Sequence, residues 1–66
     1  MNLEERVYSV LVASAAENFN SALAAMLPAA AFSPVTVVSG ISAAKRAFAE
    51  QNYDFVIVNS PLPDEP

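Results

Sequence analysis

Cysteine, histidine and tryptophan are missing from this chain of 66 residues, and glycine occurs only once. Without cysteine or histidine, the chain has no disulfide, zinc or haem ligand with which to stabilise so short a fold. A chain of this length buries only about 60% of the surface that its unfolded form exposes. Self-association is therefore the remaining way to bury more surface. The lack of cysteine is also in keeping with a cytoplasmic location.

Basic residues are scarce as well. Three lysines and arginines stand against seven acids, which gives a net charge of −4. This balance disfavours nucleic-acid binding by this segment, because such binding needs cations for the phosphates. Lys45 and Arg46 are adjacent, and we interpret them as the solvated face of a helix. No pattern in the sequence indicates a metal or another cofactor.

No charged residue lies between positions 17 and 45, a stretch long enough to span a bilayer. Pro28, Pro34 and Gly40 interrupt it, however, and each interruption would leave backbone polar groups unsatisfied in lipid. The first six residues lack the basic region of a signal peptide. We therefore expect no membrane association and a cytoplasmic chain.

Three short runs rich in β-branched residues predict strands, at residues 7–13, 35–38 and 55–58. Nearly continuous apolar runs of this kind are typical of strands buried on both faces. Pro34 suits the start of a strand or an edge strand, because proline cannot donate to a ladder.

Two amphipathic helices are predicted between these strands. Ser14 and Glu17 have the spacing of a capping box at the start of the first helix, and Pro28 ends it. Gln51 and Asn52 close the second helix. The apolar faces at helical spacing are formed by Phe19, Leu23, Met26 and Leu27 in the first helix, and by Ile41, Ala44, Ala47 and Phe48 in the second.

The order is therefore strand, helix, strand, helix, strand, which predicts an α/β fold with parallel strands and right-handed crossovers. Residues 59–66 contain three prolines and are predicted to form a loop. We expect Tyr8 and Tyr53 to be packing residues, and Asp54 and Asp64 to be loop or cap acids.

The third predicted strand and its tail, Tyr53 to Asp64, resemble a segment of the receiver domains of two-component response regulators, the CheY-like family. In that family, an apolar strand ends in the phospho-accepting aspartate, and a Leu-Pro or Met-Pro step follows, as Leu62-Pro63 does here. Residues 10–15 similarly resemble the first receiver strand, which leads into a pair of acids. Ser39-Gly40 before the second helix also fits. The resemblance covers nearly the whole chain.

The resemblance places Asn59 at the phospho-acceptor position and Ser14 and Ala15 at the acidic-pair positions. A receiver binds Mg²⁺ with those acids, and Mg²⁺ prefers hard, charged oxygen ligands. All three positions lack a carboxylate here, and a carboxamide cannot form an acyl phosphate. The resemblance therefore implies a degenerate pseudo-receiver with no catalytic residues, no metal and no enzymatic activity.

The resemblance also implies a flavodoxin-like half domain, with a three-stranded parallel sheet in the order 2-1-3. Residues 1–66 would be the amino-terminal part of a receiver-like domain that stops before its third helix. The third strand would then be an exposed apolar edge, and such edges invite pairing with another chain. We expect protein partners or self-association, through this strand or through the helix faces.

Two functions remain open at this point. The first is a phosphorylation-independent regulatory or interaction module of a response-regulator-like protein, acting upstream of an RNA- or DNA-binding output domain in transcription regulation. The alternative is a fragment of a flavodoxin-like domain that binds a small ligand or cofactor beyond the carboxyl ends of its strands. No glycine-rich phosphate loop supports that alternative, since Gly40 follows the second strand instead of the first.

Overall fold

The computed structural model describes residues 6–65. The prediction that the chain has no signal peptide rests on the first six residues and therefore lies almost wholly outside the described part. Strands and helices alternate along the chain, as the sequence predicts. The elements are β1 (Tyr8–Ala13), α1 (Glu17–Met26), β2 (Phe32–Val38), α2 (Ile41–Glu50) and β3 (Phe55–Val58).

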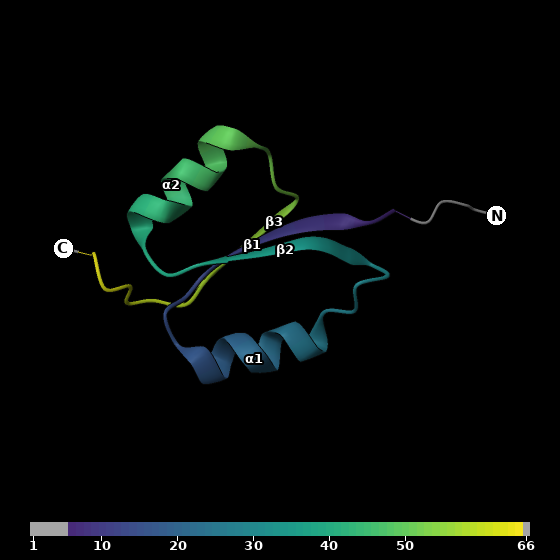
Figure 1. The fold of residues 1–66 in the computed structure, drawn as a ribbon, viewed down its shortest axis with the longest axis horizontal. Coiled ribbons are helices and arrows are strands. Elements are labelled where there is room, and N and C mark those ends of the chain that lie inside the picture. Colours follow the sequence, from purple (N-terminus) through teal and green to yellow (C-terminus); the bar gives the residue numbers. More distant parts are fainter. Residues whose placement is uncertain (1–5, 66) are drawn as a thin grey trace.

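The three strands form one parallel sheet in the order β2-β1-β3, which confirms the predicted α/β arrangement. Along the chain, the first crossover moves from β1 to β2 and the second passes back over β1 to β3. Figure 1 shows α1 on one face of the sheet and α2 on the other. Two crossovers that run in opposite directions place their helices on opposite faces when both have the same hand.

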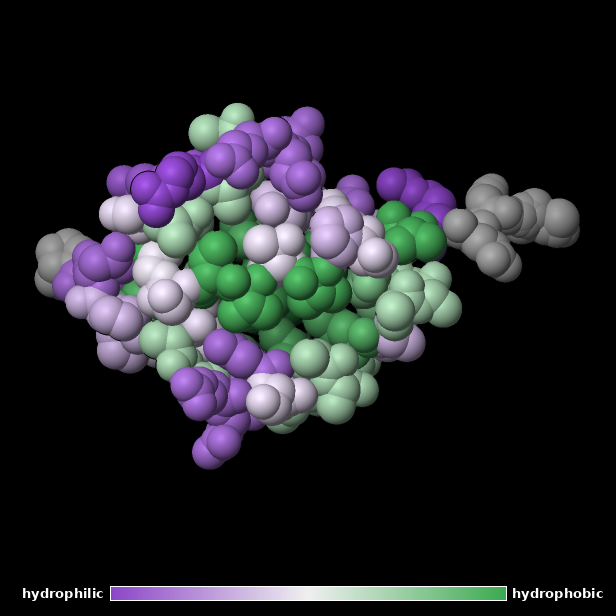
Figure 2. Space-filling view, in the orientation of Figure 1, coloured by the Kyte–Doolittle hydropathy of each residue, from purple (hydrophilic) through white to green (hydrophobic). Residues whose placement is uncertain are grey.

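The core is centred on β1, because this strand has a neighbour on each side and a helix over each face. Val10, Leu11, Val12 and Ala13 are all buried. Figure 2 shows apolar side chains gathered between the two helices and polar ones on the outer helix surfaces. The apolar run in β1 therefore has the double burial that its sequence predicts.

The start of α1 corrects one prediction. Ser14 and Glu17 do not form a capping box: Ala16 occupies the cap position, and no side chain caps the helix there. Ser14 instead continues the path of β1, since its backbone N–H donates to the carbonyl of Val38 at 2.8 Å. The Ser14 N–H that Glu17 would bind in a capping box is already bonded to Val38, and the Ser14 hydroxyl accepts from the N–H of Ala16 and not from that of Glu17.

The apolar faces of the helices are less buried than their spacing predicts. No residue of α1 is buried, and Met26 is 73% exposed. In α2, Ala47 is buried, while Phe48 remains exposed and packs edge-to-face on Tyr53 with ring centroids 6.0 Å apart.

Strand β2 begins earlier than predicted, at Phe32, and Pro34 lies inside it. The Phe32 and Tyr8 rings pack with centroids 6.3 Å apart, and Tyr8 also packs against Phe55 at 5.5 Å. This aromatic cluster extends the sheet at its amino end. Within residues 6–65, no helix is long and apolar enough to cross a membrane.

Candidate functional site

The candidate site lies where β1 and β3 end side by side. The backbone N–H of Asn59 donates to the carbonyl of Ala13 at 2.9 Å, so the first residue after β3 sits next to the last residue of β1. From β1 the chain crosses through α1 to β2 on one side, and it then returns through α2 to β3 on the other side, so the strand order reverses between β1 and β3. In open α/β sheets, such a switch point is where ligands usually bind.

The structure brings together two of the three residues singled out from the sequence. The side-chain amide of Asn59 donates to the Ser14 hydroxyl oxygen, with 3.3 Å between Nδ2 and Oγ. The same hydroxyl oxygen accepts a hydrogen bond from the backbone N–H of Ala16 at 3.2 Å. Ser14 is 1% exposed, whereas Ala15 next to it is exposed and offers only a methyl group.

Asn20 is part of this polar cluster, and the sequence analysis missed it. It lies in the first turn of α1, and its Nδ2 donates to the carbonyl oxygen of Ser14 at 3.1 Å. Its own side-chain oxygen is buried and has no hydrogen-bond partner in the structure. The signal in the sequence was an amide side chain, besides that of Asn59, placed six positions after Ser14 on the helix that follows β1.

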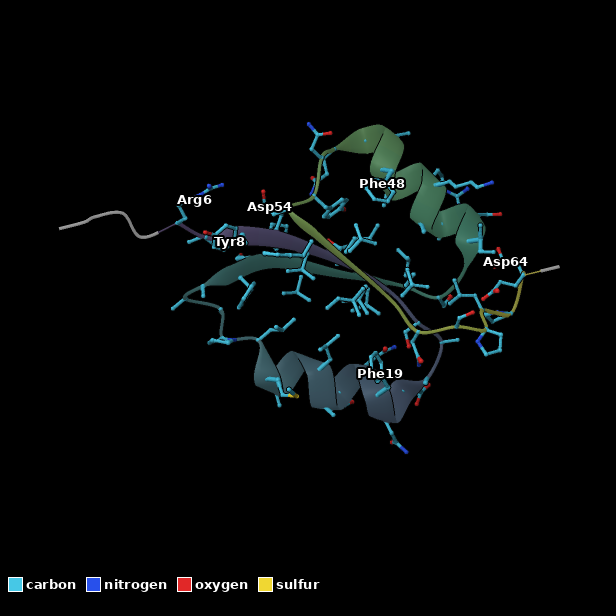
Figure 3. All side chains as sticks on the ribbon, turned by 180° about the vertical axis from the view of Figure 1, so that it is seen from behind. Arg6, Tyr8, Phe19, Phe48, Asp54 and Asp64 are labelled. Atoms are coloured by element: carbon cyan, nitrogen blue, oxygen red, sulfur yellow. The ribbon has the colours of Figure 1, made fainter. Side chains whose placement is uncertain are left out.

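Asp64, in the tail after β3, is engaged at the start of α2 and not in this polar cluster. Asp64 accepts hydrogen bonds from the backbone N–H groups of Ile41 and Ser42 at the start of α2, at 2.6 and 3.0 Å. These bonds hold the pKa of the Asp64 carboxyl below its usual value, chiefly through Ile41 and then Ser42. Figure 3 shows Asp64 at that helix end. Asp64 is thus the cap acid that the sequence predicts.

Asp54 lies at the opposite end of β3, beside the start of β1 (Figure 3). Its carboxylate accepts hydrogen bonds from the backbone N–H of Ser9 at 2.9 Å and from the Ser9 hydroxyl at 3.3 Å. The two aspartates therefore close loops at opposite ends of the sheet. Among residues 6–65, no three acidic, histidine or cysteine side chains gather as metal ligands.

The donor set at the switch point does not fit the Mg²⁺ that receiver domains with intact acids bind. Ser14 offers a hydroxyl oxygen that already accepts two hydrogen bonds, Ala15 offers no ligand, and Asn59 turns its amide nitrogen toward Ser14. Mg²⁺ sites in proteins are built on one or two carboxylates. The arrangement is a neutral hydrogen-bonded cluster that ties the ends of β1 and β3 together.

An apolar pocket of about 270 Å³ lies away from this cluster, toward the amino ends of the strands. It is lined by Val10, Leu27, Phe32, Phe55, Val56 and Ile57. Comparison with protein-family models, with curated proteins and with solved structures finds no match to this chain.

Proposed function

We propose that this chain is a phosphorylation-independent, pseudo-receiver type of regulatory module, which acts by contact with other proteins and performs no chemistry. The observation that carries the proposal is the hydrogen bond between the Asn59 amide and the Ser14 hydroxyl. It joins two strand ends where, by the resemblance, a receiver would hold its acceptor carboxylate and one of its acids. A neutral pair in that place can hold the two strands together but cannot accept a phosphoryl group.

The proposal includes a cytoplasmic location and an RNA- or DNA-binding output domain elsewhere in the protein, with this segment itself contacting protein. The charge of the chain supports contact with protein and not with nucleic acid. Lys45 and Arg46 are exposed on α2, but the chain as a whole contains seven acidic residues. A chain with a net charge of −4 is repelled by a phosphate backbone.

The test is incubation of the chain with acetyl phosphate and Mg²⁺, followed by intact-mass measurement, beside a receiver domain whose acids are intact. We expect the active receiver to gain a phosphoryl group and this chain to keep its mass. A gain of one phosphoryl group at or near Asn59 would contradict the proposal. Amide chemical shifts of Ser14, Ala15 and Asn59 should likewise stay unchanged when Mg²⁺ is added.

The alternative function, binding of a small ligand or cofactor, has less support. The pocket of about 270 Å³ lies away from the carboxyl ends of the strands, and it is smaller than the roughly 300–1,000 Å³ of ordinary ligand sites. The loop after β1, Ser14 to Ala16, has no glycine with which to cradle a phosphate. Flavin fluorescence or a nucleotide-dependent thermal shift would favour this alternative over the first function.

A further inference from the structure

Asparagine is a thermolabile residue, and how quickly it reacts depends on the residue that follows it. The backbone nitrogen of that next residue can attack the side-chain amide, close a succinimide ring and expel ammonia. In this chain, three asparagines precede the bulky residues Leu3, Phe19 and Tyr53, which hinder the attack. Asn20 and Asn59 are each followed by a small serine. These are therefore the two amides whose surroundings have to be compared.

The backbone is held at Asn20 and not at Asn59. Asn20 lies inside α1, its own N–H donates to the carbonyl of Ala16 at 2.9 Å, and Ser21 belongs to the same helical ladder. Asn59 follows the end of β3, outside any helix or strand. Among the described residues, no hydrogen bond engages the carbonyl of Asn59 or the N–H of Ser60. The peptide link that turns during ring closure is thus unbonded at Asn59 alone.

The side chain of Asn59 has one restraint, its hydrogen bond to Ser14. The 3.3 Å between Nδ2 and Oγ is slightly longer than usual, but Ser14 itself is fixed, since it is 1% exposed and its N–H donates to Val38. Nδ2 is the atom that leaves as ammonia. An amide N–H is a stronger donor than the amine that replaces it once the carbon becomes tetrahedral. The bond to Ser14 therefore stabilises the intact amide more than the reacting one.

We propose that Asn59 is a self-modification site that deamidates, and that Ser14 sets the rate. The Ser60 nitrogen forms a bond to Cγ of Asn59, the bond between Cγ and Nδ2 breaks, and the proton given up by the Ser60 N–H leaves with Nδ2 as ammonia. Water then opens the ring at either of its carbonyl carbons. Opening at Cγ gives aspartate, and opening at the main-chain carbon gives isoaspartate, in which the main chain runs through Cβ and Cγ.

Both products carry a new carboxylate at the end of β3, but they differ in the main chain. Isoaspartate inserts an extra methylene between β3 and the tail in which Leu62 is buried and Asp64 binds the N–H of Ile41. In the isoaspartate form, separated by ion exchange, the Ile41 amide should therefore exchange faster with solvent. This inference goes beyond the proposed function and does not depend on the receiver resemblance.

The first test is incubation of the parent chain at mildly alkaline pH, with peptide mapping and side-chain amide resonances to follow each asparagine. We expect Asn59 to be the first asparagine lost, with aspartate and isoaspartate as products and an equal amount of ammonia released. A free peptide of residues 58–62 supplies the reference rate. Earlier loss of Asn20, or an intact Asn59 after the peptide is fully converted, overturns the inference.

Ser14→Ala tests the restraint. It should speed the loss of Asn59 about fivefold, the factor that corresponds to one hydrogen bond of about 1 kcal/mol. The matched control is Ser9→Ala at the other end of β1, which removes a hydroxyl bonded to Asp54 at 3.3 and 3.1 Å and should leave the rate unchanged. An unchanged rate in Ser14→Ala overturns the role of Ser14. Equal acceleration in both variants does so too, because it would trace the reaction to general loss of stability.

Ser60→Thr tests the ring closure without weakening the fold. Threonine keeps the hydroxyl that donates to Glu65 at 2.6 Å and adds a methyl group beside the attacking nitrogen. The loss of Asn59 should slow severalfold, whereas an unchanged rate would mean direct hydrolysis by water and would overturn the proposed step. A phosphoryl group adds far more mass than the exchange of an amide for a carboxylate. Failure of the proposed function and failure of this inference are therefore distinguishable in the same mass spectrum.

Discussion

The carboxylate of Asp64 accepts a hydrogen bond from the backbone N–H of Ile41 at 2.6 Å, although 23 positions separate the two residues. Its second oxygen accepts from Ser42 at 3.0 Å, so one side chain satisfies two of the free N–H groups at the start of α2. Gly40 precedes the helix and has no side chain with which to cap it. A Cβ at that position would lie 3.0 Å from Asp64 Oδ1, so the glycine also leaves room for the carboxylate.

The hydrogen bonds that Asp64 and Glu65 accept lead us to expect that the fold is less stable in acid. The pKa of Asp64 is lowered from 3.8 by the N–H groups of Ile41 and Ser42, and that of Glu65 is lowered from 4.5 by the Ser60 hydroxyl and then by the N–H of Leu62. A carboxyl whose folded pKa is depressed stabilises the fold above its unfolded pKa and loses this effect as the pH falls through the folded pKa. The thermal midpoint should therefore fall as the pH drops below about 4.5.

Asp64→Asn separates the titration from the shape of the side chain. The amide oxygen can still accept one hydrogen bond at the end of α2, but it does not ionise and interacts less well with the helix dipole. We expect a lower midpoint at neutral pH and a shallower fall in acid, with the contribution of Glu65 remaining. Melting curves of parent and variant over a pH series measure both effects. Identical curves would show that Asp64 does not cap α2 in solution.

Leu62 anchors the same tail to the body of the protein. It is 6% exposed, although prolines flank it on both sides and the segment is a loop. Leu62→Ala should lower the free energy of unfolding by about 2–3 kcal/mol, the low end for buried leucines, because a loop can partly collapse onto the space. Leu62→Met conserves volume and should cost less than about 1.5 kcal/mol.

Urea denaturation of the two Leu62 variants gives these values. Hydrogen exchange adds a local readout, since the Ile41 and Ser42 amides should exchange faster in Leu62→Ala if the tail and its cap detach together. Equal stability of the alanine and methionine variants would mean that the tail is not held by this side chain.

Much of the fold could be predicted because its signals are local. The β-branched runs mark all three strands, and Pro28 and Gln51 mark the helix ends to within two residues. The alternation of strands and helices implies the parallel sheet. The early start of β2 could not be predicted, because Phe32 joins the sheet through its contact with Tyr8, which is distant in sequence.

The site shows the same division between local and distant information. The resemblance located Ser14 and Asn59 at adjacent strand ends, and the structure places them in contact. The capping box at Ser14 was wrong because the local pattern S-x-x-E does not reveal that Val38 already holds the Ser14 backbone in the sheet. Asn20 was missed because its contact with Ser14 exists only once α1 has taken its direction.

Ser14 should contribute measurably to stability through its hydroxyl. Ser14→Ala removes the acceptor for the Asn59 amide and for the Ala16 N–H, of which only the Asn59 donor is partly buried. We expect a loss of about 1–2 kcal/mol in the free energy of unfolding, the cost of leaving one partly buried donor without a partner. Ser39→Ala, at an exposed serine, should change it by less than about 0.5 kcal/mol. Equal effects in the two variants would contradict a structural role for the Ser14 cluster.

Asn59→Asp introduces a carboxylate at the position where the receiver resemblance places the phospho-acceptor, and we expect the fold to tolerate it. A hydroxyl can rotate, so Ser14 can donate to the new carboxylate where it now accepts from the Asn59 amide. The free energy of unfolding should change by about 1 kcal/mol or less. Nevertheless, this variant should neither bind Mg²⁺ measurably nor gain a phosphoryl group from acetyl phosphate, because its one carboxylate would have only neutral side chains beside it, and Mg²⁺ loses its water ligands reluctantly.

The double variant Ala15→Asp with Asn59→Asp provides the comparison. Position 15 is exposed, so a carboxylate there costs little desolvation, and it lies next to Ser14 at the end of β1. Two carboxylates at the switch point match the upper end of the one or two on which protein Mg²⁺ sites are built. Addition of Mg²⁺ should therefore shift the amide resonances around positions 14, 15 and 59 in the double variant and not in Asn59→Asp. Equal Mg²⁺ response in the two variants would show that the missing acid at position 15 is not what prevents metal binding.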